Sequence, residues 1–421
     1  MDILVVGGGG REHAIIWSLS KSPRAGKIYC APGNAGIAQL AECVPIGVFE
    51  FDRLTAFAKE REVGLVVIGP DDPLAGGIVD AFEAEGIPVF GPRRNAAEIE
   101  GSKTFMKDLL HKYNIPTAAY EKFDDYEAAA AYLQEQPLPI VIKADGLAAG
   151  KGVTVAYSRE EADKALADIM VSKVFGEAGA QVVIEEFLAG QEMSILAFVD
   201  GETVRPMAAA QDHKPVFDGD KGPNTGGMGT YSPLPHIDEA IIREAVETII
   251  EPTAKAMVAE GRPFSGVLFA GLMISPDGKP KTIEFNARFG DPETQVVLPR
   301  LKSDLLEIFL AVVEGRLADI EIEWSEEAAV CVVLASGGYP GSYPKGEPIS
   351  GLEEDGEGLV FHAGTARGED GSWLTNGGRV LGVVGLGADI REAREAAYAR
   401  AERIVFPGKQ SRSDIAMKAL V

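Results

Sequence analysis

Short apolar runs alternate with amphipathic stretches through the N-terminal part of the chain. The apolar runs are rich in β-forming residues and lie at 2–6, 27–31, 65–69 and 88–90. The stretches between them have helical spacing and lie at 11–20, 51–60 and 76–85. Glycine or proline separates most neighbours. Strands that alternate with helices in this way predict a doubly wound, parallel α/β sheet, and we expect one such domain over residues 1–102.

Beyond residue 102 strands and helices follow one another without strict alternation. Ser102 is placed to cap a helix that ends before Pro116. Three β-rich runs follow, at 140–146, 153–157 and 181–188. A helical stretch at 159–171 lies among them, which is typical of a small antiparallel α+β unit. We expect this unit to be a separate subdomain at residues 123–189.

Two further parts complete the chain. The central part, at 103–122 and 190–326, contains a long helical pattern at 238–260 and two β-rich runs joined by Asp277-Gly278, a strong hairpin signal. The last part, at 327–421, has three β-rich runs and a helical stretch, and we expect a closing α+β domain. The chain is therefore predicted to be multidomain, with α/β and α+β parts.

Composition and charge exclude several classes of protein. Hydrophobic residues make up 46% and charged residues 25% of the 421 residues, which excludes extended disorder. Lysine and arginine number 40 against 64 acidic residues, a net charge of −24 that would repel nucleic acid and anionic membranes. No apolar run approaches the roughly 18 residues of a membrane span, the N-terminus resembles no leader, and the three cysteines lie far apart. We therefore expect a cytoplasmic protein without disulfides that binds neither nucleic acid nor membrane.

The first candidate for chemistry is the glycine turn Gly7–Gly10, between the first strand and the first helix. Backbone amides of such a turn can approach a phosphate, and the helix N-terminus favours its negative charge. A dinucleotide fingerprint is disfavoured because Glu12 stands where its third glycine would fall and no acid ends the second strand. We expect a small phosphorylated ligand here, held also by the loop 34–36, with a purely structural turn as the alternative.

The second candidate is the lysine- and glycine-rich segment 142–153. It is not a P-loop, because Gly152 stands where serine or threonine would bind magnesium, and a strand follows instead of a helix. Lys143 at a strand end, followed by a glycine loop, suits a flap over nucleotide phosphates; the alternative is a flexible surface hairpin. On a later strand Glu185 and Glu186 point to opposite faces, which favours a hinge that binds a base and a ribose over two solvated acids.

The most informative segment is 281–294. Period-two alternation places Glu284, Asn286 and Arg288 on one face of a strand, with Ile283 and Phe285 on the other. A carboxylate and an amide oxygen at this spacing suit Mg²⁺, which takes few protein ligands and completes its shell with phosphate and water. Arg288 would face the same anion. A structural polar face is the alternative.

A turn-rich loop at 222–229 follows the polar run Asp212-His213-Lys214. So many small residues in an otherwise ordered block predict an ordered loop that lines a site and not a linker. His213 itself is expected to be structural.

Three of these motifs, namely the lysine flap, the EEFL strand and the EFNARFGDPE strand, together resemble the ATP-grasp fold. With GGGGREH, APGNAG, IKADGLAAGKGV, QDHK and GPNTGGMGTYSP added, the sequence is similar to the glycinamide ribonucleotide synthetase family, also called phosphoribosylamine-glycine ligases, over essentially its whole length. The resemblance implies a Rossmann-like N-terminal domain, an ATP-grasp core with a small lid, and a C-terminal domain. It also implies an ATP-dependent ligase of purine biosynthesis that joins glycine to 5-phosphoribosylamine through glycyl phosphate, with Mg²⁺ or Mn²⁺ and with ATP as co-substrate.

Family roles fall on individual residues through this resemblance alone. The ATP site would comprise Lys103, Lys143, Gly146, Gly150, Lys151, Gly152, Glu185, Glu186, Phe187, Leu188 and Glu192, with the acids of the EEFL strand near the adenine. The other substrates would contact Gly9, Gly10, Asn34, Gly36, Asp71, Asp212, Lys214, Pro223, Asn224, Thr225, Gly226 and Arg288. Glu284 and Asn286 would bind the metal, and the catalytic residues would be Arg288, Lys143, Asp212 and Lys214.

The sequence departs from the family pattern in three places. Asp71 replaces the glutamate of a GPExPL turn, Ala416 replaces the last glycine of an RxDIG element, and residues 268–274 lack the acid that often joins the metal site in ATP-grasp enzymes. A second metal would then depend on Glu284 and the phosphates. We expect small-molecule partners, a transient contact with the upstream amidotransferase, and a monomer. The alternatives are another ATP-grasp carboxylate-amine ligase or carboxylase, and an ATP-binding regulatory protein, which the complete metal and arginine face disfavours.

Overall fold

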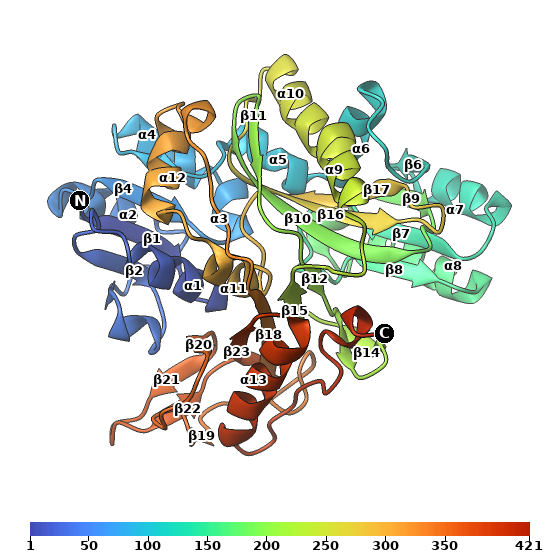
Figure 1. The fold of residues 1–421 in the computed structure, drawn as a ribbon. Coiled ribbons are helices and arrows are strands. Elements are labelled where there is room, and N and C mark those ends of the chain that lie inside the picture. The colour runs from blue at the N-terminus through green and yellow to red at the C-terminus, as the bar shows by residue number, and fades with distance from the viewer.

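A sheet of five parallel strands forms the N-terminal domain of the computed structural model, which describes residues 1–421 (Figure 1). Its order is β3-β2-β1-β4-β5, with bounds Ile3–Gly7 (β1), Ile28–Pro32 (β2), Glu42–Cys43 (β3), Leu65–Ile68 (β4) and Val89–Phe90 (β5). Helix α1 (Gly10–Leu19) packs on one face, and α2 (Phe51–Glu60) and α4 (Ile78–Ala84) pack on the other. Helices on both faces of a parallel sheet confirm the doubly wound prediction.

An antiparallel sheet of order β11-β10-β16-β17 forms the central domain. Its strands are Gln191–Asp200 (β10), Thr203–Pro206 (β11), Ser265–Ile274 (β16) and Pro280–Asn286 (β17). Its helices are Lys103–Lys112 (α6), Glu239–Ala245 (α9), Glu251–Ala259 (α10) and Leu305–Val313 (α12), and Arg94–Gly101 (α5) leads into it from the N-terminal domain. Apolar residues of α9 and α10 pack on one face of the sheet and those of α12 on the other. The predicted hairpin of β16 and β17 is confirmed, and Gly278 in its turn has φ +80°.

The lid is a separate sheet of four antiparallel strands, of order β6-β9-β7-β8, with its own apolar core. Its strands are Tyr120–Phe123 (β6), Ile140–Ala144 (β7), Val153–Ala156 (β8) and Val182–Glu186 (β9), and its helices are Tyr126–Glu135 (α7) and Arg159–Met170 (α8). The predicted α+β unit is confirmed. It begins at Tyr120 and not at residue 123, because β6 pairs with β9. The lid lies on the side of the central sheet away from the N-terminal domain (Figure 1).

The C-terminal sheet crosses the predicted boundary at residue 327. Its order is β12-β15-β18-β23-β20, and its strands are Gln211–Asp212 (β12), Gly229–Ser232 (β15), Ala328–Ala335 (β18), Leu359–His362 (β20) and Arg379–Gly387 (β23). Two of these strands thus come from the central part of the sequence, which a boundary at 327 would separate from their neighbours. Helix α13 (Ile390–Arg403) packs against β18 and β23.

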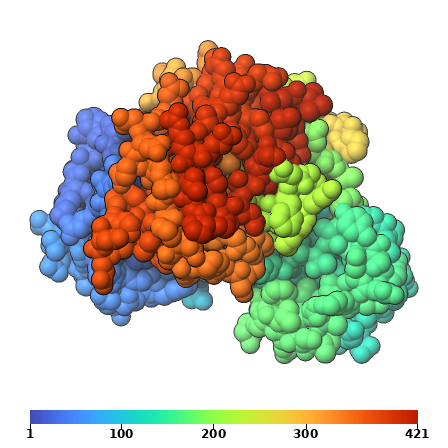
Figure 2. Space-filling view, turned by 90° about the horizontal axis from the view of Figure 1, so that it is seen from below, coloured from blue at the N-terminus to red at the C-terminus, as the bar shows by residue number.

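A hairpin of β13 (Pro215–Phe217) and β14 (Lys221–Asn224) projects between β12 and β15. In the space-filling view its yellow-green atoms lie between the red C-terminal segment and the green lid (Figure 2). The predicted ordered loop is therefore placed where three parts of the molecule meet. None of the helices is both long and apolar enough to span a membrane.

Candidate functional site

Three buried charged side chains meet where the lid strands lie against α6. Lys143 lies on β7, Glu185 on β9 and Lys107 on α6, and each side chain is at most 4% exposed. Glu185 Oε1 lies 3.0 Å from Lys143 Nζ, and its Oε2 lies 3.4 Å from Lys107 Nζ. Glu186 is half exposed on the opposite face, so the prediction that the two acids face apart is confirmed. Glu185 holds the predicted phosphate-binding lysine, a role different from the adenine contact implied for it.

The base of the flap contacts the N-terminus of α6, which Ser102 caps as predicted. The N–H of Lys103 donates to the carbonyl of Asp145 at 3.0 Å, and the Asp145 carboxylate accepts from Ser102 Oγ at 3.2 Å. Lys103 Nζ donates to the Gly146 carbonyl at 3.2 Å, and burial lowers the pKa of this lysine. The tip at 149–151 is exposed. Both predicted phosphate lysines therefore flank the base of a hairpin whose tip is exposed to solvent.

The strand that carries the predicted metal ligands contains a bulge. Thr282 and Glu284 pair with consecutive residues of β16, so Ile283 between them has no partner. The extra residue resets the period-two alternation. Thr282 and Phe285 are buried in consequence, whereas Ile283 is only half buried. The prediction that Ile283 and Phe285 share a face is wrong.

Glu284 and Asn286 fit a divalent cation. The side chain of Glu284 is half buried and takes part in none of the ion pairs around it. The amide oxygen of Asn286 accepts a 3.3 Å hydrogen bond from Arg288 Nη2. No group of three or more histidine, cysteine or acidic side chains forms a metal cluster. A cation here would thus be held by one carboxylate and one amide oxygen, and phosphate and water would complete its shell, as Mg²⁺ prefers.

Arg288 is held by Glu100, a residue of α5 that the sequence did not indicate. Arg288 Nη2 lies 3.1 Å from Glu100 Oε1, and the other carboxylate oxygen accepts from the N–H of Ala287 at 2.7 Å. Burial raises the pKa of Glu100 to about 7, against the opposing effect of Arg288. Arg288 Nε has no partner. The guanidinium is therefore fixed at one edge and has a donor left for an anion.

The buried carboxylates of Asp212 and Glu293 form an acidic cluster with the partly exposed Lys214, beside the metal strand. Lys214 Nζ lies 2.6 Å from Asp212 Oδ2 and 3.9 Å from Glu293 Oε1. The Glu293 side chain is 1% exposed, and neither of its oxygens has a hydrogen-bond partner. Burial and the charge of Asp212 raise the pKa of Glu293 to about 7, although Lys214 opposes this. Two carboxylates around one ammonium carry a net negative charge, which favours a second cationic group.

The turn-rich loop packs directly on this acidic cluster, at Asp212. Gly227 has φ +127°, and a Cβ there would lie 2.7 Å from an Asp212 oxygen, so only glycine fits. Thr225 Oγ1 donates to the Lys214 carbonyl at 2.7 Å and accepts from the Gly227 N–H at 2.9 Å. The N–H of Gly226 donates to a tyrosine hydroxyl at 3.1 Å. Pro223 and Asn224 are exposed on β14, away from the acidic cluster.

The N-terminal glycine turn meets the site at Asp291. The N–H of Gly9 donates to Glu12 Oε2 at 2.8 Å, so this predicted phosphate donor is already used within the helix cap. Asn34 Nδ2 donates to the carbonyls of Gly8 and His362, at 3.0 and 2.8 Å, so its amide joins two domains. Three predicted positions remain. Gly10 faces Gln295, and Gly36 packs on His362. Against the opposing effect of burial, the negative charge of Asp71 helps that of Glu12 to raise the pKa of Arg11.

Other predicted positions lie at the rim of the lid. Phe187 is exposed, with its ring 6.2 Å from that of Tyr157, and the side chain of Glu192 is exposed on β10. Leu188 is half buried, and Gly152 is buried where the flap returns to β8. His213 is buried and structural, as expected, with Nδ1 3.0 Å from the Gly229 carbonyl.

Four charged residues of the site were missed by the sequence reasoning. Glu293 stands inside the GDPE motif and could have been found there. Lys107 lies one helical turn after Lys103 on α6, a spacing that places both on one helix face, whereas Glu100 belongs to α5, a different helix. Arg379 gave no signal. It comes from β23, and its Nη1 donates to the Asp291 carbonyl at 3.0 Å, a contact that only the tertiary fold creates.

Family models cover nearly the whole chain in three consecutive parts. Those of phosphoribosylglycinamide synthetase match residues 1–100 (N domain), 101–294 (ATP-grasp domain) and 329–418 (C domain). The chain belongs to the phosphoribosylglycinamide synthetase family. In this chain the lid falls inside the matched ATP-grasp domain, and so does β15, although β15 pairs with β18 of the C domain.

Curated and solved relatives of this chain agree with the match. A phosphoribosylamine-glycine ligase of Halalkalibacterium halodurans is 54% identical over 421 residues, which are 100% of this chain and 97% of the relative. The crystal structure of the phosphoribosylamine-glycine ligase of Thermotoga maritima is 37% identical with a TM-score of 0.86, over 99% of this chain and 100% of that one. The biotin carboxylase domain of a Hydrogenobacter thermophilus 2-oxoglutarate carboxylase, solved with MgADP and bicarbonate, has a TM-score of 0.73 at 15% identity, over 97% of this chain and 91% of that one. This last likeness shows a shared fold.

Proposed function

We propose that this chain is an ATP-dependent ligase that joins glycine to 5-phosphoribosylamine and gives glycinamide ribonucleotide, ADP and phosphate in purine biosynthesis. Whole-length relatives that carry the name phosphoribosylamine-glycine ligase support this substrate pair. The observation that carries it in the structure is the acidic cluster of the buried carboxylates Asp212 and Glu293, beside a strand with Glu284, Asn286 and Arg288. Such a site accepts a small zwitterion next to the phosphates of a nucleotide.

In the first step a carboxylate oxygen of glycine attacks the γ-phosphorus of ATP, the bond to the bridging oxygen breaks, and ADP leaves. Lys103 and Lys143 would hold the phosphates, and the free Nε of Arg288 would stabilise charge on the transferred group. A divalent cation held by Glu284 and Asn286 would neutralise phosphate oxygens. This step gives glycyl phosphate and needs no protein nucleophile.

In the second step the amine of 5-phosphoribosylamine attacks the carbonyl carbon of glycyl phosphate. The C–O bond to phosphate breaks, phosphate leaves, and the amine loses a proton. Catalysis would rest on positioning and on exclusion of water, because the mixed anhydride hydrolyses readily. The flap 145–152, anchored by Asp145 at α6, would close over the intermediate.

Glycine labelled with ¹⁸O in its carboxylate tests this route. If glycyl phosphate forms, each turnover transfers one labelled oxygen to inorganic phosphate, because the attacking oxygen leaves with the phosphoryl group. The label is read by mass spectrometry of the phosphate, in reactions from which ATP, glycine or freshly made 5-phosphoribosylamine is omitted in turn. Unlabelled phosphate would contradict the intermediate, and ADP release with bicarbonate in place of glycine would contradict the named substrate.

Glu293→Gln is expected to raise the KM for glycine about 10- to 100-fold, because the ammonium of glycine loses a charged hydrogen-bond partner. The KM for ATP should stay within about twofold, since Glu293 lies beside Lys214 and the turn-rich loop at 222–229 and not beside the phosphate lysines. Initial rates at saturating ATP measure the effect. Glu307→Gln, an exposed acid of α12 paired with Arg24, is the matched control. An unchanged KM for glycine would remove Glu293 from the glycine site.

Several finer expectations stay predictions. The choice between Mg²⁺ and Mn²⁺ is one of them, as are the monomeric state, the contact with the upstream amidotransferase and the cytoplasmic location. The oxygen ligands of the predicted metal site suit Mg²⁺ and Mn²⁺ alike, so both ions are expected to support activity.

A further inference from the structure

Lys107 is a cation that the proposed mechanism does not use. Its side chain is fully buried on α6, and its Nζ donates to Thr117 Oγ1 at 2.7 Å and to the Ala118 carbonyl at 3.3 Å. Its third neighbour is the Glu185 carboxylate at 3.4 Å. Placing a second lysine beside a buried ion pair costs desolvation, and a neutral side chain would fill the same space without that cost. The position therefore calls for a role beyond packing.

The Glu185 carboxylate is divided between two lysines from different parts of the protein. One oxygen lies 3.0 Å from Lys143 Nζ and the other lies 3.4 Å from Lys107 Nζ. If Lys107 were absent, both oxygens would be free to approach Lys143, and the pair would be neutral. With Lys107 present the three side chains carry one excess positive charge, which favours a bound polyphosphate in this low-dielectric setting.

The same network reaches the strand with the metal ligands. Thr117 Oγ1, which accepts from Lys107, donates to the Thr282 carbonyl at 2.9 Å. Lys143 Nζ lies 3.4 Å from the Ile283 carbonyl, next to Glu284. Lys107 is thus linked through side chains to the phosphate lysine and to the backbone that carries the metal ligand.

We propose that Lys107 is a positioning residue for ATP, which acts through Glu185 by preventing that carboxylate from drawing Lys143 away from the nucleotide phosphates. The inference rests on the proposed function, in which Lys143 binds ATP. Lys107 contacts neither substrate nor metal, and its effect should appear in the affinity for ATP alone.

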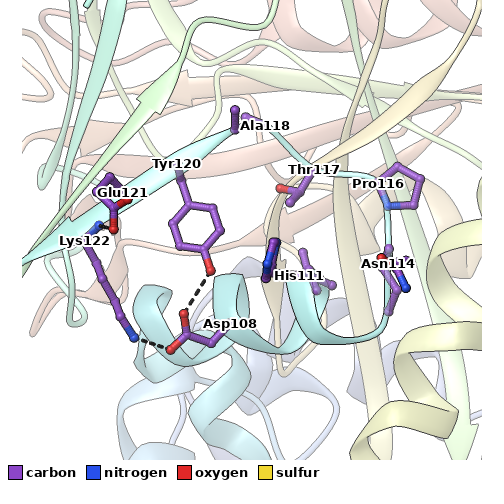
Figure 3. Close-up of a pocket in the computed structure, with 12 residues that line it drawn as sticks. Asp108, His111, Asn114, Pro116, Thr117, Ala118, Tyr120, Glu121 and Lys122 are labelled. Atoms are coloured by element: carbon purple, nitrogen blue, oxygen red, sulfur yellow. Dashed lines mark hydrogen bonds and ion pairs between the residues drawn. The ribbon is translucent and has the colours of Figure 1, made fainter. Parts of the chain in front are cut away.

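The neighbouring residue on α6 offers a matched control. Asp108 accepts from the hydroxyl of Tyr120 at 2.9 Å and pairs with Lys122, so it braces α6 to β6 on the outer side of the hinge (Figure 3). These residues line an open crevice of about 590 Å³ between α6 and the chain at 114–122. Asp108 forms its contacts with Tyr120 and Lys122 and none with Glu185 or Lys143, although the Tyr120 ring lies 5.5 Å from Lys107 Nζ. Asp108→Asn therefore perturbs the lid hinge without changing the phosphate lysines.

The test is a double-mutant cycle with Lys107→Met, Glu185→Gln and both together. Lys107→Met is expected to raise the KM for ATP about tenfold, with the KM for glycine within about twofold, because one charge-assisted contact is redistributed. On the Glu185→Gln background the same substitution should change the KM for ATP less than twofold. Lys107→Arg, which keeps the charge, should recover part of the affinity. Lys107→Gln repeats the cycle if the methionine variant does not fold, as checked by circular dichroism.

Three results would overturn the inference. Lys107→Met could behave like Asp108→Asn, with a lower melting temperature and an unchanged KM for ATP. The change that Lys107→Met causes in the KM for ATP could be equal with and without Glu185. Alternatively, Lys107→Met could raise the KM for glycine as much as the KM for ATP. Lys143→Met separates this failure from that of the proposed function: if it too leaves the KM for ATP unchanged, the ATP-binding role of Lys143 is wrong, and otherwise only the role of Lys107 is.

Discussion

Replacing Glu284 with glutamine is expected to lower kcat about 100- to 1000-fold, the usual effect of removing one electrostatic contact to a reacting phosphoryl group. The half-buried Glu284 carboxylate forms no ion pair with the protein, so its charge is available to a cation that bridges it to ATP. Glutamine keeps the shape and the oxygen but loses the charge. ADP release with glycine and freshly generated 5-phosphoribosylamine measures the loss.

Metal titration makes the interpretation of Glu284→Gln specific. The variant should need a higher concentration of Mg²⁺ or Mn²⁺ for half-maximal activity, because a neutral amide binds hard cations more weakly than a carboxylate. Glu244→Gln is the control, since Glu244 pairs with Lys279 at the turn of the same hairpin, and exposed pairs contribute little. An unaltered metal requirement in Glu284→Gln would exclude this residue as the metal ligand.

Arg288→Met is expected to lower kcat about 100-fold and to change the KM for glycine little, because the guanidinium would act on charge that develops during phosphoryl transfer. The substitution also leaves the buried Glu100 without its ion pair, which would raise the pKa of that carboxyl above its value of about 7, a value already set mainly by burial. Glu100 would then be protonated at neutral pH. The protein should therefore fold, and loss of activity would not reflect an unfolded chain.

Two further variants separate the roles of Arg288 and Glu100. Arg288→Lys keeps a charge but lacks the planar fork that reaches Glu100 and an anion together, so we expect only partial recovery. Glu100→Gln should leave Arg288 charged and less well oriented, with a smaller loss of kcat. If Arg288→Met retained more than about half of the wild-type kcat, Arg288 would have no part in stabilising the reaction's charge.

Local patterns in the sequence were sufficient for most elements of the fold. In the N-terminal domain four of the five strands are apolar runs that the sequence predicts, whereas the short edge strand β3 (Glu42–Cys43) has no such pattern and was not predicted. The helix cap at Ser102 and the turn at Gly278 also depend on a few neighbouring residues, and both are confirmed. Where a structure is determined within such a short window, the sequence predicts it well.

The failures have a different physical origin. The bulge at Ile283 depends on how β17 meets β16, so the alternation of side chains alone could not reveal it. Strand β15 joins β18 across the predicted boundary because pairing depends on the whole fold. Arg379 donates to the Asp291 carbonyl from the C-terminal part of the chain, and Asn34 donates to the His362 carbonyl. Both contacts join residues far apart in the sequence, so local patterns could not reveal them. Residue types at the site were predictable, whereas their partners were not.

The shared C-terminal sheet also sets the order in which a growing chain can complete its site. Strands β12 and β15, which lie on either side of the turn-rich loop in the sequence, leave the ribosome well before β18 and β23, the strands that extend their sheet. Helix α6, the lid and β17 are by then already synthesised, and N-terminal units generally fold first. The loop at 225–227 gains the contact from Arg379 Nη1 to the Gly227 carbonyl only when Arg379 has been made. A nascent enzyme is thus expected to acquire its nucleotide half first and its acceptor half last.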